Sequence, residues 1–447
     1  MEVKVLKILK FITDKMAKKE ANSRKSLIIK LLIVVFIIFI IGCATQEVSV
    51  PEEVLEKPEV IEEIPIEDVL EEPEEEILEE LEPVEEEVPE EIIQRDNTGL
   101  GLTLHDGFTI SEFTERGLGS LRFMAFSPDG ILFVTMPSIS GLYGIIPLGG
   151  KVLALPDLDK DGKADEVKTV ISGLNNRPHG IAFYNGYLYI TGEDKVSRYK
   201  YQNNGDIGKA EHVVNLPSGN SHVSRTIGFS PSGKMYVSVG SSCNVCKEPR
   251  RENAAILEFN DDGSNKKIFA EGLRNAVGFI FHPVTGEMWA TENGRDWLGE
   301  DLPPEEINIV KEGKHYGWPY CYGKKIVDPK FNDANFCTNT EPSLWDMQAH
   351  SAPLGLRFIE SKQFQEWEGD LIVAYHGSWN RKVPTGYKVV RLDIEGNKIV
   401  GEEDFISGWL KSGSKKGRPV DAIFDSEGAL YISDDKLGVI YRITKIE

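Results

Sequence analysis

Positive charge is scarce in this chain of 447 residues, which carries 50 Lys and Arg against 72 Asp and Glu. Most of the acidic excess lies in one segment, because residues 47–92 hold 22 acidic residues and a single lysine. Residues 1–42 have a net charge of +6, and residues 93–447 have a net charge of about −7. The larger part of the chain therefore lacks the basic face that nucleic-acid binding requires, and we expect no nucleic-acid partner.

Long apolar runs are also absent. The longest run, LLIVVFIIFII, covers residues 31–41, whereas a membrane-spanning helix needs about 20 residues. A basic stretch precedes the run and Ile41-Gly42-Cys43 follows it, which is typical of a secretion signal and resembles the lipobox of bacterial-type lipoproteins. We therefore expect residues 1–43 to be a lipoprotein-type signal peptide with lipidation at Cys43, or alternatively an uncleaved membrane anchor. Both alternatives would leave the rest of the chain outside the cytoplasm and anchored to the cell membrane.

The acidic segment has no stretch that could form a long helix. Six prolines interrupt it, at positions 51, 58, 65, 73, 83 and 89, and proline breaks a helix interior. Like charges repel and extend such a chain. We expect residues 44–96 to be a disordered spacer before a folded domain of residues 97–447; binding of cations or of a basic partner by this segment is the alternative.

Cysteine is rare, with five residues in the chain. Those beyond the predicted lipobox are Cys243, Cys246, Cys321 and Cys337. An even number of cysteines in an exported domain predicts two disulfides, and of the three possible pairings, proximity in sequence favours Cys243–Cys246 and Cys321–Cys337. Lys247 follows Cys246, so this CxxC lacks the histidine of a haem c attachment site, and we expect it to be a structural clip.

One phrase recurs six times between Phe126 and Phe424: an aromatic residue, a short turn with glycine, then a strand. The copies begin at Phe126, Phe183, Phe229, Phe281, Phe358 and Phe424. The intervals between them run from 46 to 77 residues. A strand–turn–strand unit at such a period is typical of a β-propeller with one blade per repeat. We therefore predict an all-β fold, a six-bladed β-propeller, in which equivalent positions of every blade surround one channel.

Polar and cationic residues gather six to eight positions before these aromatic residues. They are His222, Arg274, Asn275, His350, Arg418 and one of Asn176 and Arg177. In a propeller this offset is the start of the innermost strand, so we expect these side chains to converge at one mouth of the channel. Clustered cations favour an anion such as a multiply charged carboxylate or phosphate. A histidine among them is a candidate general base, because neighbouring cations lower its pKa.

Several phrases carry a resemblance to a known family. They are SHVSRTIGFSPSGKMYVSVGSSCNVC (221–246), EGLRNAVGFIFHP (271–283), TENGRD (291–296) followed by EEIN (305–308), HYGWP (315–319), HSAPLGLRF (350–358), HGSWNR (376–381) and GRPVDAIFDSEGALYISDDKLGVIYRI (417–443). Over about residues 100–447 the chain resembles the PQQ-dependent soluble glucose and L-sorbosone (aldose sugar) dehydrogenase family. HGSWNR and the CNVC segment resemble its sorbosone-type branch.

The resemblance implies an oxidoreductase that holds pyrroloquinoline quinone (PQQ) and Ca²⁺ at the channel mouth. His222 would take the proton from the hydroxyl of an aldose sugar, or of a related alcohol or aldehyde, while hydride passes to the quinone. The resemblance makes Arg274 both catalytic and cofactor-binding, and Asn275 and Arg418 cofactor-binding. The backbone carbonyls at Gly294 and Arg295 would hold Ca²⁺, which prefers oxygen ligands. Since no haem or flavin motif is present, electrons would pass to an external acceptor.

Three positions depart from the pattern of this family. Ser241 stands where an acidic residue orients the catalytic histidine, and Val420 stands where the last blade has a second arginine. A cofactor-contacting lysine of the fifth blade falls near His376. His376 or Arg381 would replace that lysine, and Trp379 would stack on the cofactor.

A separate acidic loop lies between the first two copies of the repeat. Asp157, Asp159, Asp161 and Asp165 alternate with other residues, and Gly162 stands at the sixth position. This spacing resembles the first half of an EF-hand-like loop and predicts a second, structural Ca²⁺; a loop of Asx turns is the alternative.

Two other classes of function remain open from the sequence. A non-catalytic propeller used for binding at the cell surface is one of them, because propellers can keep their shape without chemistry. A metal-dependent lactonase or hydrolase is the other, but it requires carboxylate and Asn ligands at the mouth, where the blade starts supply mostly cations.

Overall fold

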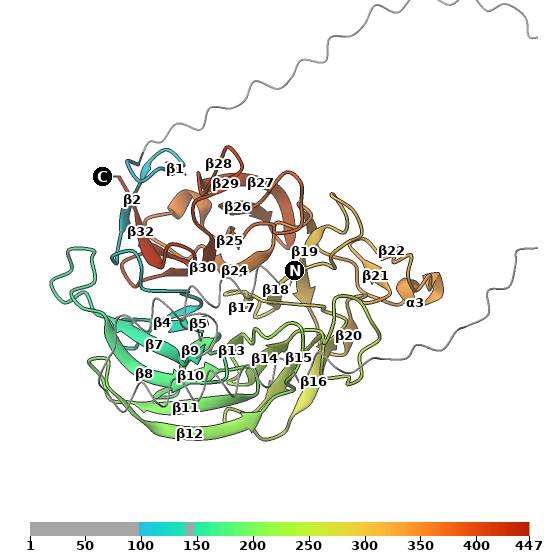
Figure 1. Cartoon of the computed structure of the whole chain (residues 1–447), viewed down its shortest axis with the longest axis horizontal. Coiled ribbons are helices and arrows are strands. Elements are labelled where there is room, and N and C mark those ends of the chain that lie inside the picture. The colour runs from blue at the N-terminus through green and yellow to red at the C-terminus, as the bar shows by residue number, and fades with distance from the viewer. Residues whose placement is uncertain (1–97, 138, 141–146, 447) are drawn as a thin grey trace, which may run out of the picture. The chain divides into compact units, whose positions relative to one another are not determined.

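The computed structural model of the chain describes residues 98–137, 139–140 and 147–446 (Figure 1). The predicted signal peptide of residues 1–43, with Cys43, and the predicted spacer of residues 44–96 lie outside these ranges. Within them, no helix combines the length and the apolar character needed to cross a membrane.

The described chain forms six antiparallel sheets of at least four strands, arranged as the blades of a ring (Figure 1). Blade one holds β3 (Met124–Phe126), β4 (Leu132–Met136), β7 (Gly150–Leu155) and β8 (Lys168–Leu174). Blade two holds β9 (Ile181–Tyr184), β10 (Tyr187–Thr191), β11 (Lys195–Tyr201) and β12 (Ile207–Asn215). Blade three holds β13 (Ile227–Phe229), β14 (Met235–Val239), β15 (Ala255–Phe259) and β16 (Lys267–Glu271), to which β20 (Lys314–His315) adds in parallel.

The remaining blades follow in chain order. Blade four holds β17 (Phe279–Phe281), β18 (Met288–Glu292), β19 (Glu305–Val310) and β23 (Trp345–Met347). Blade five holds β24 (Pro353–Phe358), β25 (Leu371–Tyr375), β26 (Lys388–Glu395), β27 (Lys398–Ser407) and β1 (Thr103–Leu104). Blade six holds β30 (Pro419–Phe424), β31 (Leu430–Asp434), β32 (Val439–Lys445) and β2 (Phe108–Glu112). The predicted six-bladed all-β propeller is thus confirmed.

Short elements decorate the ring. The two-stranded pairs are β5 (Ile139–Ser140) with β6 (Pro147–Leu148), β21 (Cys321–Tyr322) with β22 (Ile326–Val327), and β28 (Leu410–Lys411) with β29 (Ser414–Lys415). The described helices are α3 (Ala334–Thr338) and the 3₁₀ turn η2 (Gln365–Trp367). Disulfides join Cys243 to Cys246 and Cys321 to Cys337, as their proximity in sequence predicts.

The repeated phrase has a direct structural cause. Its aromatic residue is the last residue of the first strand in five blades and the last but one in blade two, where β9 ends at Tyr184. Its glycine makes the turn into the second strand. Gly130, Gly233 and Gly428 have φ values of +85°, +83° and +87°, a left-handed conformation that costs other residues energy. The second strands that follow, β4, β14, β18, β25 and β31, are buried at every position. Neighbouring sheets cover both of their faces, so these strands are apolar in runs rather than in alternation.

The first strands of the blades line the centre of the ring. Strand β9 contacts both β3 and β13, and β24 contacts both β17 and β30. Strand β30 in turn contacts β3, and the Thr226 hydroxyl donates a hydrogen bond to the Val277 carbonyl between blades three and four. The segments that lead into these strands therefore meet around one opening.

The first described strands close the ring from the other end of the sequence. Strand β2 pairs with β32 from Phe108↔Lys445 to Glu112↔Tyr441, so the two ends of the propeller share blade six (Figure 1). Phe108 stacks on Phe364 with ring centroids 4.5 Å apart, and it contacts Phe405 edge to face. Closure thus combines strand pairing with aromatic burial.

We expect Phe108→Ala to lower the free energy of unfolding by about 3–5 kcal/mol, because it leaves a cavity in the closing blade. Urea unfolding followed by fluorescence measures this. Thr109→Ala is the matched control, since Thr109 is the exposed neighbour on the same strand. Equal midpoints for the two variants would contradict the role given to Phe108.

Candidate functional site

A cavity of about 240 Å³ opens where the leading segments of the innermost strands meet. Its lining includes His222, Arg274, Asn275, His350 and Arg418. These residues come from blades three to six, and their common position before the repeated aromatic residue predicts this convergence. The segments that lead into four blades thus place these polar side chains around one cavity.

Blade two departs from the expected pattern. Asn176 lines a different cavity, and the Arg177 side chain is 56% exposed and lies 3.8 Å from Glu193. The prediction that one of the two joins the mouth is therefore wrong. The physical reason is local: Arg177 has a left-handed backbone, with φ of +51°, and the segment turns away before β9 begins.

Arg122 lines the mouth cavity and was not predicted from the sequence. It stands four positions before Phe126, the same offset that Val420 has from Phe424. The cation that is absent at Val420 of blade six is thus present in the adjacent blade one. A comparison of the six repeats at this second offset reveals it, because the polar residues there are Arg122, His179 and Arg225.

Hydrogen bonds determine which nitrogen of His222 can accept a proton. Its Nδ1 lies 2.8 Å from the Ser241 hydroxyl, and that hydroxyl donates its own proton to the Cys243 carbonyl at 2.7 Å. Nδ1–H must therefore donate to Ser241, which leaves the lone pair of Nε2 free. Ser241 thus orients the imidazole, but it supplies no negative charge to stabilise an imidazolium.

Burial is the main reason why His222 stays neutral. Desolvation, with a smaller contribution from the Arg274 charge, lowers the pKa of His222 to about 3. The sequence led us to expect the cations as the cause, whereas burial is the larger effect. The Arg225 guanidinium also donates to the His222 carbonyl at 2.8 Å, which holds the backbone of this residue in place.

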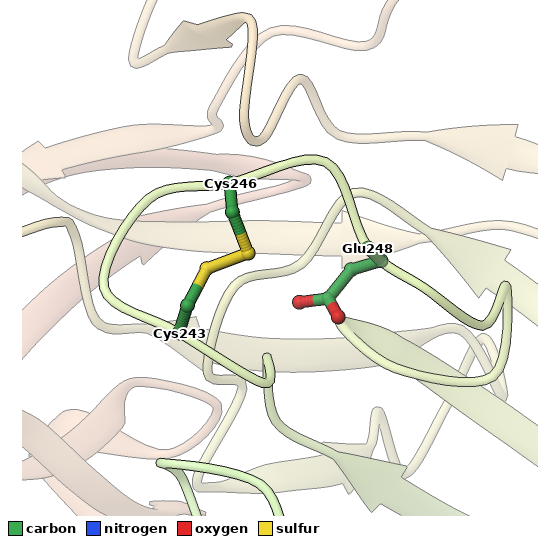
Figure 2. Close-up of side chains that lie close together, drawn as sticks. All are labelled: Cys243, Cys246 and Glu248. Carbon is green, nitrogen blue, oxygen red and sulfur yellow. A yellow bond between two sulfur atoms is a disulfide. The ribbon is translucent and has the colours of Figure 1, made fainter.

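A disulfide-closed loop holds Arg274 in the mouth. Asn244 lies between Cys243 and Cys246, and Figure 2 shows this disulfide beside Glu248. The Arg274 Nε donates to the Asn244 carbonyl and its Nη2 to the Asn244 Oδ1, both at 2.9 Å. Glu248 in turn accepts from the Ser242 backbone at 2.8 Å. The CxxC segment thus forms a disulfide, as expected, and the loop that it closes holds the buried Arg274 guanidinium through Asn244.

Blade five and blade six share a network of charges at the mouth. The Arg418 guanidinium donates to the carbonyls of His376 and Gly377 at 3.1 and 2.6 Å. The His376 Nε2 lies 3.0 Å from the Asp435 carboxylate, which also accepts from Arg122 at 2.8 Å. Burial lowers the pKa of His376 to about 4, so this side chain is neutral and the positive charge comes from the two arginines.

Arg381 does not take part in this network. It pairs with Asp301 at 3.0 Å, outside the residues that line the cavity. Of the two candidates to replace the expected lysine, His376 therefore reaches the mouth and Arg381 does not. Trp379 also lines the cavity, at its rim.

Oxygen atoms gather at the side of the cavity formed by blade four. Gly294 lines the cavity and donates its N–H to the Glu305 carboxylate at 2.6 Å. The carbonyls of Gly294 and Arg295 accept no hydrogen bond from other described residues. Burial raises the pKa of Glu305 to about 8, and a nearby cation would favour its ionised form. Glu305 belongs to the EEIN phrase, but sequence reasoning gave it no role.

Arg295 has its side chain directed elsewhere. Its guanidinium makes two bonds of 2.9 Å to the Asp328 carboxylate, and it borders a smaller, neighbouring cavity. The predicted contribution of Arg295 through its carbonyl stays a prediction, since it requires only backbone.

The acidic loop between β7 and β8 of blade one has features of both a Ca²⁺ loop and a loop of Asx turns. Carboxylate oxygens of Asp157, Asp159 and Asp165 lie within 4.8 Å of one another, whereas Asp161 is outside this group. All four carboxylates also accept local backbone N–H groups, such as Asp161 from Lys163 at 2.8 Å. The second, structural Ca²⁺ at Asp157, Asp159, Asp161 and Asp165 stays a prediction.

Comparisons with known proteins identify the family of the chain and agree with its fold. A family model described as TrAA12-like matches residues 102–446. A protein of unassigned function from Borreliella burgdorferi is 39% identical over 361 residues, which cover 76% of this chain and 90% of that protein. The pyrroloquinoline quinone-dependent sugar dehydrogenase of Hypocrea jecorina is 25% identical over 325 residues, 59% of this chain and 73% of that one. A calcium structure of the Trichoderma reesei carbohydrate-active enzyme family AA12 has the same fold, with a TM-score of 0.66 and 21% identity over 77% of this chain and 97% of that one.

We expect the ring of His222 to show no titration between about pH 5 and pH 8, because a pKa near 3 keeps it neutral throughout. The pKa is lowered because burial penalises the charged imidazolium, so the ring is protonated only in stronger acid. Carbon- and nitrogen-detected NMR of the histidine rings measures this, with His222→Gln to assign the signal. An inflection near pH 6.5 would contradict the burial argument.

Proposed function

Because the chain belongs to the TrAA12-like family, we propose that it is a PQQ-dependent dehydrogenase that oxidises an aldose sugar or a related alcohol or aldehyde. One observation carries the proposal: a neutral histidine with a free Nε2 and three arginines face the same solvent-open cavity. Relatives described as sugar dehydrogenases support it.

The charges around the cavity fit the proposed cofactor. PQQ is a planar tricarboxylate, and Arg122, Arg274 and Arg418 approach the cavity from three different blades. Guanidinium groups pair well with carboxylates through their forked geometry. Arg274, Asn275 and Arg418 would hold the cofactor as the resemblance implies, and Arg122 would add the cation that blade six lacks. The expected stacking of Trp379 on the cofactor stays a prediction, since its indole is 62% exposed at the edge of the cavity.

A Ca²⁺ ion would occupy the oxygen-rich side of the same cavity. The carbonyls of Gly294 and Arg295 and the Glu305 carboxylate are hard oxygen donors of the kind that Ca²⁺ prefers. The backbone ligands were expected from the sequence, and the carboxylate is an addition. When bound, PQQ with its metal supplies the two-electron acceptor that the chain itself lacks.

The protein's own residues would control the proton. His222 Nε2 would accept the proton of the hydroxyl on the carbon that loses hydride, as a general base worth about 10²–10⁴ in rate. Ser241 keeps the opposite nitrogen protonated, so the accepting lone pair stays aimed at the cavity. Arg274 would hold the developing negative charge at the reacting oxygen, since the Asn244 clamp fixes its position.

We also propose the sorbosone-type branch as the nearer comparison, on the strength of the HGSWNR and CNVC phrases. An extracytoplasmic location with membrane anchoring through Cys43 or an uncleaved helix belongs to the proposal too. Two disulfides in the domain support export, because disulfides persist in oxidising compartments. The electron acceptor would then be an external molecule.

A non-catalytic binding propeller is the second candidate. The observation that favours it is the absence of a carboxylate behind His222, where Ser241 supplies only a hydroxyl. In that case the protein would oxidise no sugar, even with PQQ bound.

Addition of PQQ and Ca²⁺ to the purified chain should produce dye reduction with at least one aldose, and His222→Ala should lower kcat by about 10²–10⁴ through loss of the base. PQQ affinity, measured by fluorescence quenching, should change little in that variant. Tight PQQ binding with no turnover on an aldose panel would favour the binding propeller. No PQQ binding at all would exclude the enzyme.

Arg418→Lys should weaken PQQ binding about tenfold, because lysine loses the forked contact of the guanidinium. Equilibrium dialysis with PQQ and Ca²⁺ measures the change. Arg251→Lys is the matched control, since the Arg251 side chain is 78% exposed and pairs with Glu271 away from the mouth. Equal affinities for both variants would show that Arg418 does not contact the cofactor.

A further inference from the structure

Two tryptophans stand exposed beside the mouth. Trp297 is 69% exposed and Trp379 is 62% exposed, although tryptophan is normally buried for most of its surface. Their ring centroids lie 5.4 Å apart and their planes meet at 87°. The two indoles therefore form a right-angled apolar corner that faces solvent.

The corner is built from two loops that are fastened to each other. Trp297 lies between β18 and β19, and Trp379 lies between β25 and β26, so the loops belong to adjacent blades. The Asn380 amide donates to Asp296 at 2.7 Å, and the Lys382 backbone donates to Glu300 at 3.0 Å. The exposed rings are thus presented by a tied pair of loops, which reduces the entropy lost when a ligand binds.

The backbone of Trp297 adds a second observation. Its φ is +67°, a left-handed conformation that is rare and strained for a bulky residue. Such strain persists where surrounding contacts enforce it, and it clusters at functional sites. Here the strained residue holds an apolar ring in water, so the arrangement does not serve the stability of the fold.

The position of the corner identifies what would cover it. Trp379 borders the mouth cavity together with Asp296 and Asn380. A sugar that reacts in this cavity must leave its remaining substituents pointing toward the rim. A pyranose ring has an apolar C–H face that packs on an indole and hydroxyls that donate to carboxylates. Asp296, Glu300 and Asp301 lie within four residues of Trp297 in sequence.

We propose that Trp297 and Trp379 form a subsite for a second sugar unit, so that the substrate class is an oligosaccharide with an oxidisable end rather than a free monosaccharide. This inference rests on the proposed function. Its occupant is one pyranose linked to the reacting sugar. A protein electron acceptor docked on the same corner is the competing occupant.

Calorimetry on the full chain without added quinone tests the subsite directly. The probes are glucose and the disaccharides cellobiose, maltose and lactose. At least one disaccharide should bind about tenfold more tightly than glucose, the scale expected of an aromatic contact. Trp297→Ala should remove that preference, and Trp297→Phe should retain most of it because a ring remains. Val383→Ala, at an exposed position on the same loop as Trp379, is the control and should change nothing.

Dye reduction on the PQQ-loaded chain gives the second reading. The ratio of kcat/KM for the preferred disaccharide to that for glucose should fall about tenfold in Trp297→Ala. Disaccharide preference without any dye reduction would overturn the proposed enzyme but support the subsite. Equal saccharide affinities in the wild type and Trp297→Ala would overturn the subsite. If Trp297→Ala reacted more slowly than the wild type with a protein acceptor but not with the dye, and its saccharide affinity were unchanged, the subsite would also be overturned in favour of acceptor docking.

Discussion

Pairing of β2 with β32 is the constraint on which the rest of the molecule depends. Each blade packs only on its neighbours, so the channel mouth exists only while the ring is closed. The Arg122–Asp435 ion pair, 2.8 Å long and joining blade one to blade six, crosses this closure. So does the bond from the Met124 backbone to the Asp421 carboxylate at 2.9 Å. The contacts that close the ring between blades one and six therefore also help to form the polar mouth.

Desolvation decides the chemistry that the mouth can perform. Burial lowers the pKa of both His222 and His376, to about 3 and about 4, and it raises that of Glu305 to about 8. Burial therefore favours the neutral form of these three groups, and a cation beside Glu305 would favour its carboxylate form. The mouth thus combines three arginines with a neutral histidine that has no carboxylate bonded to its Nδ1.

The sequence predicts this fold well because the first strand of every blade ends at an aromatic residue and the turn after it contains a glycine. It also predicts the mouth residues of four blades, since a repeat register is a geometric rule. It fails for Arg177, whose left-handed backbone cannot be inferred from a repeat. It misses Arg122, because that arginine occupies a second offset at which blade six has Val420. Glu305 is missed because the loop before β19, and not the repeat, brings it to Gly294.

A crystal structure of the chain grown with PQQ and CaCl₂ tests the central claim most directly. Our account predicts quinone density in the mouth cavity, with carboxylates within hydrogen-bonding distance of Arg418 and Arg274 and a cation beside the Gly294 carbonyl and Glu305. The reactive carbonyl edge would face His222. Density for the quinone at any other place, or a mouth that excludes it at saturating concentration, would contradict the account.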